Sequence, residues 1–249
     1  MEVVAVVNRK GGVGKTATAQ ALGAGLIRKG YSVLYIDLDS QTNLTYGLGA
    51  DAGGLSSMDV LTGEATIQQA IQKTPQGDAI AGSEDLAGAD AAIDGTGKEY
   101  RLKEAIEGLK YDYIIIDTPA ALGTLTVNAL TAANSVIIPV QAEVYSLQGI
   151  GQLSKAVDAV RKYCNRDLNI KGILITRYNG RAVISKDMQS NLAEAAEQLK
   201  TRLYSTPIRE CVSIKEAQAS QTDIYSYAPR SNAAKDYEDF INEFLERKG

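Results

Sequence analysis

The sequence predicts an α/β fold in which a doubly wound, mostly parallel sheet is flanked by helices in three layers. Short apolar runs rich in Val and Ile alternate with longer amphipathic stretches, which is the pattern of parallel strands joined by helices. The 249 residues are 45% hydrophobic, which is enough for a sizeable core. No linker divides the sequence, and its length suits one domain of this class. We therefore expect a single domain over residues 1–249.

The predicted elements alternate in order along the chain. Strands are expected at Val3–Val7, Val33–Ile36, Tyr113–Ile116, Val136–Val140 and Gly172–Thr176. Helices are expected at Lys15–Lys29, Leu102–Leu109, Leu125–Ala133, Gln148–Tyr163, Lys186–Arg202 and Asn232–Arg247. The stretch Thr74–Gly97 is rich in Gly, Ala and Asp, so we expect loops there and at most one short strand.

The residue types that are missing narrow the possible chemistry. The chain contains no histidine, which excludes an imidazole base, a Ser/His/Asp triad and a His-ligated metal. Cys164 and Cys211 are far apart, which argues against a disulfide framework, an iron–sulfur cluster or a zinc site. No signal peptide opens the sequence, and no apolar run approaches the roughly 18 residues of a membrane span. These observations favour a cytoplasmic protein.

A glycine-rich segment between the first strand and the first helix nearly matches the phosphate-loop pattern GxxxxGK[ST]. Arg9 replaces the first glycine of that pattern, and an extra lysine precedes a glycine pair. Glycines let the backbone amides point inward around phosphates, and the start of the following helix adds positive potential. The alternative is a glycine-rich turn with incidental lysines. The residues expected to bind nucleotide here are Lys10, Gly11, Gly12, Val13, Gly14, Lys15, Thr16 and Ala17.

Aspartates follow two more predicted strands. Asp37 and Asp39 come after the second strand, and Asp117 follows the run Tyr113–Ile116. Ligands of open parallel sheets bind beyond the carboxyl ends of the strands, so these carboxylates could meet the glycine-rich loop in one crevice. Asp117 would hold Mg²⁺ directly or through water, and one of Asp37 and Asp39 would face the water shell of the metal; we take Asp37 as the second metal candidate. A single aspartate at a strand end more often caps the next helix.

Several segments together resemble the ParA/MinD class of P-loop ATPases, which carries a deviant Walker A motif, and within it the small ParA (Soj-like) partition ATPases. The resemblance spans nearly the whole chain. It rests on Lys10–Thr16, Asp37–Asn43, Asp117–Gly123, Ile138–Glu143, Leu147–Gly149, Lys215–Ala217 and Tyr227–Ser231.

The resemblance implies a P-loop NTPase that hydrolyses ATP with Mg²⁺ and forms a face-to-face homodimer when ATP is bound. Lys10 would reach the phosphates of the other subunit, while Lys15 would bind phosphate in its own subunit. Thr16 would ligate Mg²⁺. Asp39 would position or activate the attacking water.

The resemblance also suggests where the base binds. Asn179 falls where the family contacts adenine, although a turn residue is almost as good an interpretation of that asparagine. Arg209 is a weaker candidate for the same pocket.

Charge is distributed unevenly along the chain. The net charge is −4, but residues 151–235 hold 14 basic against 8 acidic residues. A polyanion could bind there, although a solvated surface of mixed charge is equally consistent with these counts. Small ParA proteins bind DNA without sequence preference, and the resemblance makes Arg181 and Lys215 the candidate DNA contacts. Ser213 replaces another arginine of the family, which leaves half of that patch in doubt.

The family resemblance further implies a ParB-like, centromere-binding partner protein and a nucleoid-associated location. Two alternatives stay open: a switch of the same fold that positions a non-DNA cargo or a division site, as MinD does, and a small-molecule P-loop kinase or ligase. The segment Asp236–Gly249 is amphipathic but holds five acidic residues against two basic ones. Anionic lipid would repel it, so we expect it to pack against the core and expect no membrane partner.

Overall fold

The computed structural model describes residues 1–143, 146–180 and 183–246, and gives the backbone alone for 183–187. Seven strands in these ranges form one sheet in the order β3-β4-β2-β5-β1-β6-β7. Neighbouring strands are parallel, except that β3 is antiparallel to β4. The strands are β1 (Glu2–Val6), β2 (Val33–Asp37), β3 (Gln72–Thr74), β4 (Gly77–Ile80), β5 (Tyr113–Asp117), β6 (Ser135–Gln141) and β7 (Asn169–Thr176).

All five expected strands are present, and the mostly parallel, doubly wound sheet is confirmed. β4 is the short strand allowed for in the stretch Thr74–Gly97. β3 was not expected. It has three residues, none of them fully buried, and it pairs only with β4 at the sheet edge, so it lacks the apolar run that marks a buried strand.

Five expected helices match long helices of the structure: α1 (Lys15–Arg28), α7 (Thr124–Ala132), α8 (Ser146–Tyr163), α9 (Val183–Gln198) and α12 (Asn232–Leu245). The sixth, α6 (Arg101–Ala105), ends four residues before the expected Leu109. Short helices do not show in the sequence pattern, because three to eight residues give too few turns for a clear apolar period. They are α2 (Asn43–Leu48), α3 (Ser57–Thr62), α4 (Ile67–Ala70), α5 (Ala89–Ala92), α10 (Val212–Ala219), α11 (Ile224–Tyr227) and the 3₁₀ turns η1 (Glu84–Gly88) and η2 (Lys98–Tyr100).

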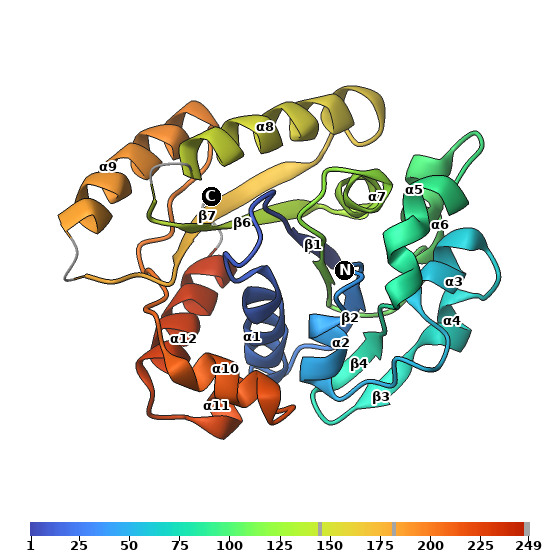
Figure 1. Cartoon of the computed structure of the whole chain (residues 1–249), viewed down its shortest axis with the longest axis horizontal. Coiled ribbons are helices and arrows are strands. Elements are labelled where there is room, and N and C mark those ends of the chain that lie inside the picture. Colours follow the sequence, from blue (N-terminus) through green and yellow to red (C-terminus); the bar gives the residue numbers. More distant parts are fainter. Residues whose placement is uncertain (144–145, 181–182, 247–249) are drawn as a thin grey trace.

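The core lies in two layers, one on each face of the sheet. Alternate residues of a strand point to opposite faces, so Val3 and Ala5 of β1 join one cluster while Val4 and Val6 join the other. Helices α7, α8 and α9 contribute to the first cluster, and α1 and α12 contribute to the second. Figure 1 shows α8 and α9 along one side of the sheet, with α1, α10, α11 and α12 gathered on the other. The expected three-layer arrangement is therefore present.

Helix α12 packs against this core, as its apolar period predicted. Tyr237, Phe240 and Phe244 are each at most 1% exposed, and the Phe240 ring meets Tyr204 edge-on at 4.7 Å between centroids. The helix approaches α1 closely at Gly25, where a Cβ atom would lie 2.1 Å from Cδ1 of Ile241. Within the described ranges, no helix has the length and hydropathy needed to cross a membrane.

Candidate functional site

The glycine-rich loop runs from β1 to α1 and is held in place by neighbouring strands. Gly12 and Gly14 have φ angles of 74° and 82°, which L-residues with a Cβ rarely adopt. Gln141, at the end of β6, donates to the Gly12 carbonyl at 3.2 Å, and the Thr176 hydroxyl, at the end of β7, donates to the Val13 carbonyl at 2.7 Å. The loop is therefore shaped by its glycines and fixed by the carboxyl ends of two strands.

Lys15 and Thr16 begin α1, directly after the loop. Lys15 is only 7% exposed. Burial lowers the pKa of Lys15, while the nearby carboxylates of Asp117 and Asp39 partly oppose that shift. The Thr16 hydroxyl donates to Oδ2 of Asp117 at 2.6 Å. The buried Lys15 and the hydrogen-bonded pair of Thr16 and Asp117 thus lie together where the loop ends.

Asp117 ends β5 and has no exposed surface. Burial raises the pKa of Asp117, and the neighbouring Asp37 raises it further. Its Oδ1 atom is buried and has no hydrogen-bond partner among the described residues. Such an orphaned oxygen costs free energy unless a bound group uses it.

The donor set around Asp117 fits Mg²⁺. No group of three His, Cys, Asp or Glu residues that could hold a metal occurs in the described part of the chain. Mg²⁺ does not need one, because it takes one or two protein oxygens and completes its shell with water and phosphate. The Thr16 hydroxyl and the carboxylate of Asp117 would supply those protein oxygens.

Asp37 lies beside Asp117 on the neighbouring strand β2, yet its carboxylate is occupied by protein donors. Oδ2 accepts from the backbone N–H and the hydroxyl of Thr45, at 2.9 and 2.7 Å, and Oδ1 accepts from the N–H of Asp39 at 3.0 Å. A Cβ on Gly82 would lie 3.1 Å from the Asp37 carboxyl carbon, so a larger residue there would crowd this carboxylate. Asp37 therefore organises the segment that carries Asp39 and leads into α2.

Asp39 lines the same cavity as the loop. Its Oδ1 accepts from the N–H of Gln41 at 3.1 Å, and the left-handed φ of Thr42, 50°, turns the chain into α2. The turn that Asp39 begins therefore holds its side chain in the lining of this cavity.

A cavity of about 620 Å³ extends away from the phosphate loop. One end is formed by Gly11, Gly12, Gly14, Lys15, Thr16 and Ala17. The far end lies between α2 and α10, where the hydroxyl of Tyr46 donates to the Ala219 carbonyl at 3.2 Å. A nucleotide with its phosphates in the loop would extend toward Ile208 and Ile214.

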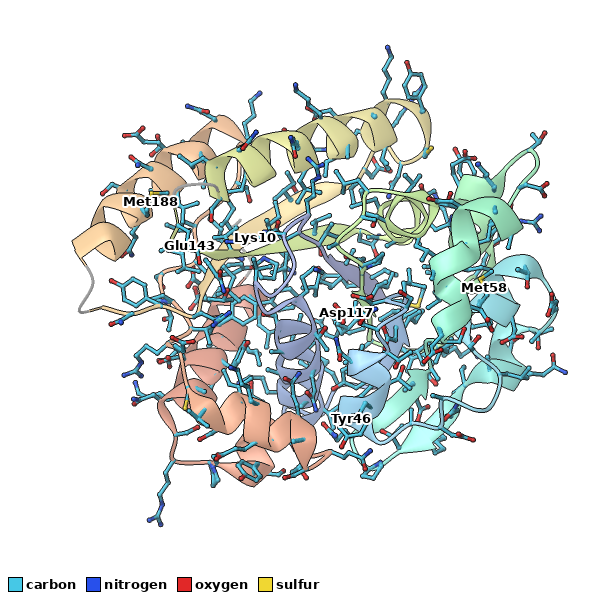
Figure 2. The ribbon with its side chains drawn as sticks, in the orientation of Figure 1. Lys10, Tyr46, Met58, Asp117, Glu143 and Met188 are labelled. Atoms are coloured by element: carbon cyan, nitrogen blue, oxygen red, sulfur yellow. The ribbon has the colours of Figure 1, made fainter. Side chains whose placement is uncertain are left out.

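Lys10 pairs within its own chain. Its ammonium group forms an ion pair with Glu143 and lies 3.5 Å from Oε1 of Gln141. Figure 2 shows Lys10 and Glu143 next to each other. Both side chains are exposed by more than a third.

Four predicted residues remain, and the structure places them differently. Arg209 lines the cavity, but its guanidinium makes two hydrogen bonds, at 2.6 and 2.9 Å, to the buried carboxylate of Asp236. Asn179 is exposed and does not line the cavity, although it follows Tyr178, whose N–H donates to the Ile208 carbonyl at 2.9 Å. Lys215 is exposed on α10 and borders the cavity. Arg181 lies outside the described residues.

Four side chains that contact or surround the loop were not among the residues predicted from the sequence. Gln141 and Glu143 lie within a motif noted in the sequence, so a signal existed. Arg177 and Glu210 pair at 3.0 Å across 33 positions of chain, and no local pattern reveals such a contact.

Comparison with known proteins adds independent findings. Residues 1–170 match a family model described as an AAA domain. The chain is 40% identical to the sporulation initiation inhibitor protein Soj of Bacillus subtilis, over 97% of each chain. It is 37% identical to the chromosome-partitioning ATPase Soj of Treponema pallidum, over 98% of this chain and 96% of that one.

A solved structure is also similar over nearly the whole length. It is described as cobyrinic acid a,c-diamide synthase from Mycobacterium smegmatis with bound ADP and magnesium, and it is 35% identical with a TM-score of 0.84. The alignment covers 98% of this chain and 94% of that one. Together with the phosphate loop and the Thr16–Asp117 pair, these similarities show that the chain belongs to the Soj/ParA family of chromosome-partitioning ATPases.

Proposed function

We propose that this protein is a Mg²⁺-dependent ATPase that works as an ATP-driven dimer switch, binds DNA without sequence preference, and segregates a chromosome, plasmid or mobile element with a ParB-like partner. The observation that carries the proposal is the cavity whose phosphate-loop end holds buried Lys15 and the Thr16–Asp117 pair. The similarity to Soj proteins supports the cellular role.

Within one subunit, the loop amides and Lys15 bind the β- and γ-phosphates of ATP. Thr16 and Asp117 hold Mg²⁺, which neutralises charge on the phosphates. Asp37 is a positioning residue, because its hydrogen bonds fix the turn that presents Asp39. Asp39 orients the attacking water and accepts its proton. A carboxylate is a weak base near neutral pH, so intrinsic turnover is slow.

Lys10 supplies the link to the second subunit. In the structure it is held by Glu143 of its own chain, through an ion pair between exposed groups. Such pairs are worth about 0–1 kcal/mol, so little free energy is needed to release the lysine toward the phosphates of a facing subunit. There it neutralises developing charge as an arginine finger does. Dimer formation thereby depends on ATP.

The DNA surface lies on the basic C-terminal part of the chain, with Arg181 and Lys215 as contacts. Contacts of lysine and arginine with phosphate need only positive charge, which fits binding without sequence preference and a nucleoid-associated protein. The ParB-like partner supplies a basic N-terminal peptide that stimulates hydrolysis and releases the dimer from DNA.

The proposal is tested by retention of the protein on an arbitrary DNA duplex, measured by biolayer interferometry. We expect retention with ATP but not with ADP, a steep loss as salt rises, and loss in R181E and K215E. Lys73→Glu is the matched control, because Lys73 is 83% exposed but lies at the sheet edge, within residues 1–149, which hold 10 basic against 17 acidic residues. Equal retention with ADP would contradict the switch. Absence of retention in any nucleotide state would favour a non-DNA cargo.

A further inference from the structure

The far end of the cavity lies between helices α2 and α10, which are neighbours in the fold (Figure 1). Asn43 and Tyr46 of α2 line the cavity, and because they are three positions apart they share one face of that helix. Ile214 and Gln218 of α10 also line it, and their spacing of four places them on one face as well. The contacts that join these two helices therefore decide how open this end of the cavity is.

One contact between the two helices lies in the cavity lining itself. The Tyr46 hydroxyl donates to the Ala219 carbonyl at 3.2 Å, and both residues line the cavity. Ala219 is the last residue of α10, so its carbonyl has no partner inside the helix. Tyr46 is 55% exposed. A hydrogen bond between neutral groups at the surface contributes little net free energy, because water replaces it when it opens.

A second contact between the same helices is buried. Gln76, which is 8% exposed, donates to the Gly47 carbonyl at 2.6 Å and to the Gln221 carbonyl, beyond α10, at 3.0 Å. Its own side-chain oxygen accepts from the amide of Gln20, on α1, at 2.9 Å. Opening this network would leave buried polar groups without partners, which costs more than opening an exposed hydrogen bond. Gln76 therefore fixes the separation of the two helices.

The side chain of Tyr46 is the part of this arrangement that can move. Its backbone is adjacent to Gly47, which the buried network holds, but its ring turns about side-chain bonds and is held at the tip by one hydrogen bond. Exposed side chains change rotamer within nanoseconds, so the ring can leave Ala219 and return while both helices stay in place. The ring thus spans the gap between α2 and α10 as a movable bar.

We propose that Tyr46 is a gate: its ring closes the far end of the nucleotide cavity while its hydroxyl is bonded to Ala219, and nucleotide enters and leaves when that bond opens. This rests on the proposed function, because it takes an adenine nucleotide as the ligand. The gate acts on passage and has no preference for the free or the bound state. It therefore slows entry and release by the same factor and leaves the equilibrium affinity unchanged.

Stopped-flow fluorescence of the full chain with methylanthraniloyl-labelled ADP and Mg²⁺ measures both rates. Tyr46→Phe keeps the ring and removes the hydroxyl that holds it. We expect its association and dissociation rate constants each to rise by about threefold to fivefold, while their ratio, the Kd, stays within about twofold. Tyr46→Ala removes the bar itself and should raise both rate constants at least as much.

Tyr100→Phe is the matched control. The Tyr100 hydroxyl donates to the Tyr163 carbonyl, also at 3.2 Å and also at the surface, but neither residue lines the cavity. Unchanged rate constants in Tyr46→Phe would overturn the proposal. Faster dissociation without faster association would overturn it too, because that result indicates a direct contact between the hydroxyl and the nucleotide. Failure of the wild-type chain to bind the labelled ADP would contradict the proposed function, and the gate with it.

Discussion

At the scale of single residues, the site is an arrangement of buried charges that a bound nucleotide and metal would complete. Lys15 is buried beside Asp117 and Asp39, and Asp117 keeps one oxygen without a hydrogen-bond partner among the described residues. Burial shifts the pKa of each toward its neutral form, downward for Lys15 and upward for Asp117. In the absence of ligand, the charged forms of these two buried side chains therefore destabilise the fold. Binding of a nucleotide and a metal would offset that loss of stability.

Asp39→Ala should lower single-turnover ATP hydrolysis by about 10²-fold, because removal of a positioned general base typically costs that much or more. ADP affinity should stay within about twofold of the wild type. Rapid-quench measurement of one turnover gives the rate without the step of product release. Asp51→Ala is the control, because Asp51 makes the same kind of turn, accepting from the Gly53 N–H at 2.9 Å, on an exposed loop. An unchanged rate in Asp39→Ala would remove Asp39 from the mechanism.

Asp117→Asn should stabilise the apo protein by about 1–3 kcal/mol and abolish its stabilisation by Mg²⁺. Burial raises the pKa of Asp117 in the folded chain, so the folded state binds this proton more tightly than the unfolded chain. Stability from this group is complete below the ordinary pKa of 3.8 and is lost as pH rises toward the raised value.

Thermal melts of the wild type between about pH 5 and about pH 8 should show that loss, and Asp117→Asn should show less of it. Burial also raises the pKa of the neighbouring Asp37, so the part of the slope that remains in Asp117→Asn is expected to belong to Asp37, whereas carboxylates with lowered pKa values, those of Asp59, Asp90 and Asp112, titrate below this window. A wild-type slope that the substitution leaves intact would assign the pH dependence to other groups.

At the scale of elements, short segments at the carboxyl edge of the sheet place the chemistry, and long helices support them. The turn after β2 is shaped by Asp37 and Thr45, and Gln76, beyond β3, donates to the carbonyls of Gly47 and Gln221 at 2.6 and 3.0 Å. These bonds connect α2 to the chain that follows α10. The cavity is likewise lined by segments that are distant in the sequence.

Helix α12 gives a test of element packing. Phe240→Ala should destabilise the protein by about 3–5 kcal/mol, because a fully buried ring is lost from between Tyr204 and Phe244. Chemical denaturation measures the change, and Glu238→Ala, on the exposed face of the same helix, should change stability by less than about 0.5 kcal/mol. If the two variants were equally stable, α12 would not pack on the core in solution.

At the scale of the whole molecule, the proposed switch depends on surfaces that one chain cannot complete. Lys10 is held by Glu143 in its own subunit, whereas the proposed function places it against the phosphates of another. If Lys10 exchanged Glu143 for the phosphates bound to the other subunit, nucleotide binding would be connected to dimer formation.

Lys10→Ala should prevent ATP-dependent dimerisation, measured by light scattering after size-exclusion chromatography, while ATP affinity of the monomer stays within a few-fold. Glu143→Gln weakens the hold on Lys10, so dimers should form at a protein concentration lower by up to about fivefold. Lys29→Ala, an exposed lysine at the end of α1, is the control. Dimers of Lys10→Ala as stable as those of the wild type would contradict a role for Lys10 in the partner's site.

Local patterns of residues are enough to predict the class of fold and the position of the phosphate loop. Both depend on local signals: apolar runs mark the buried strands, and the glycines between Lys10 and Thr16 mark a loop before a helix. The aspartates at the ends of β2 and β5 followed from the same logic, since parallel strands bring their carboxyl ends to one edge.

The different surroundings of those residues become visible in the folded structure alone. It showed that the carboxylate of Asp37 is occupied by Thr45 and Asp39, while Asp117 keeps an oxygen without a partner among the described residues. It also paired Arg177 with Glu210 in the lining of the cavity. Hydrogen bonds and ion pairs between distant segments depend on how the chain folds in space. Because the two partners are far apart in the sequence, no local pattern of residues predicts such a contact.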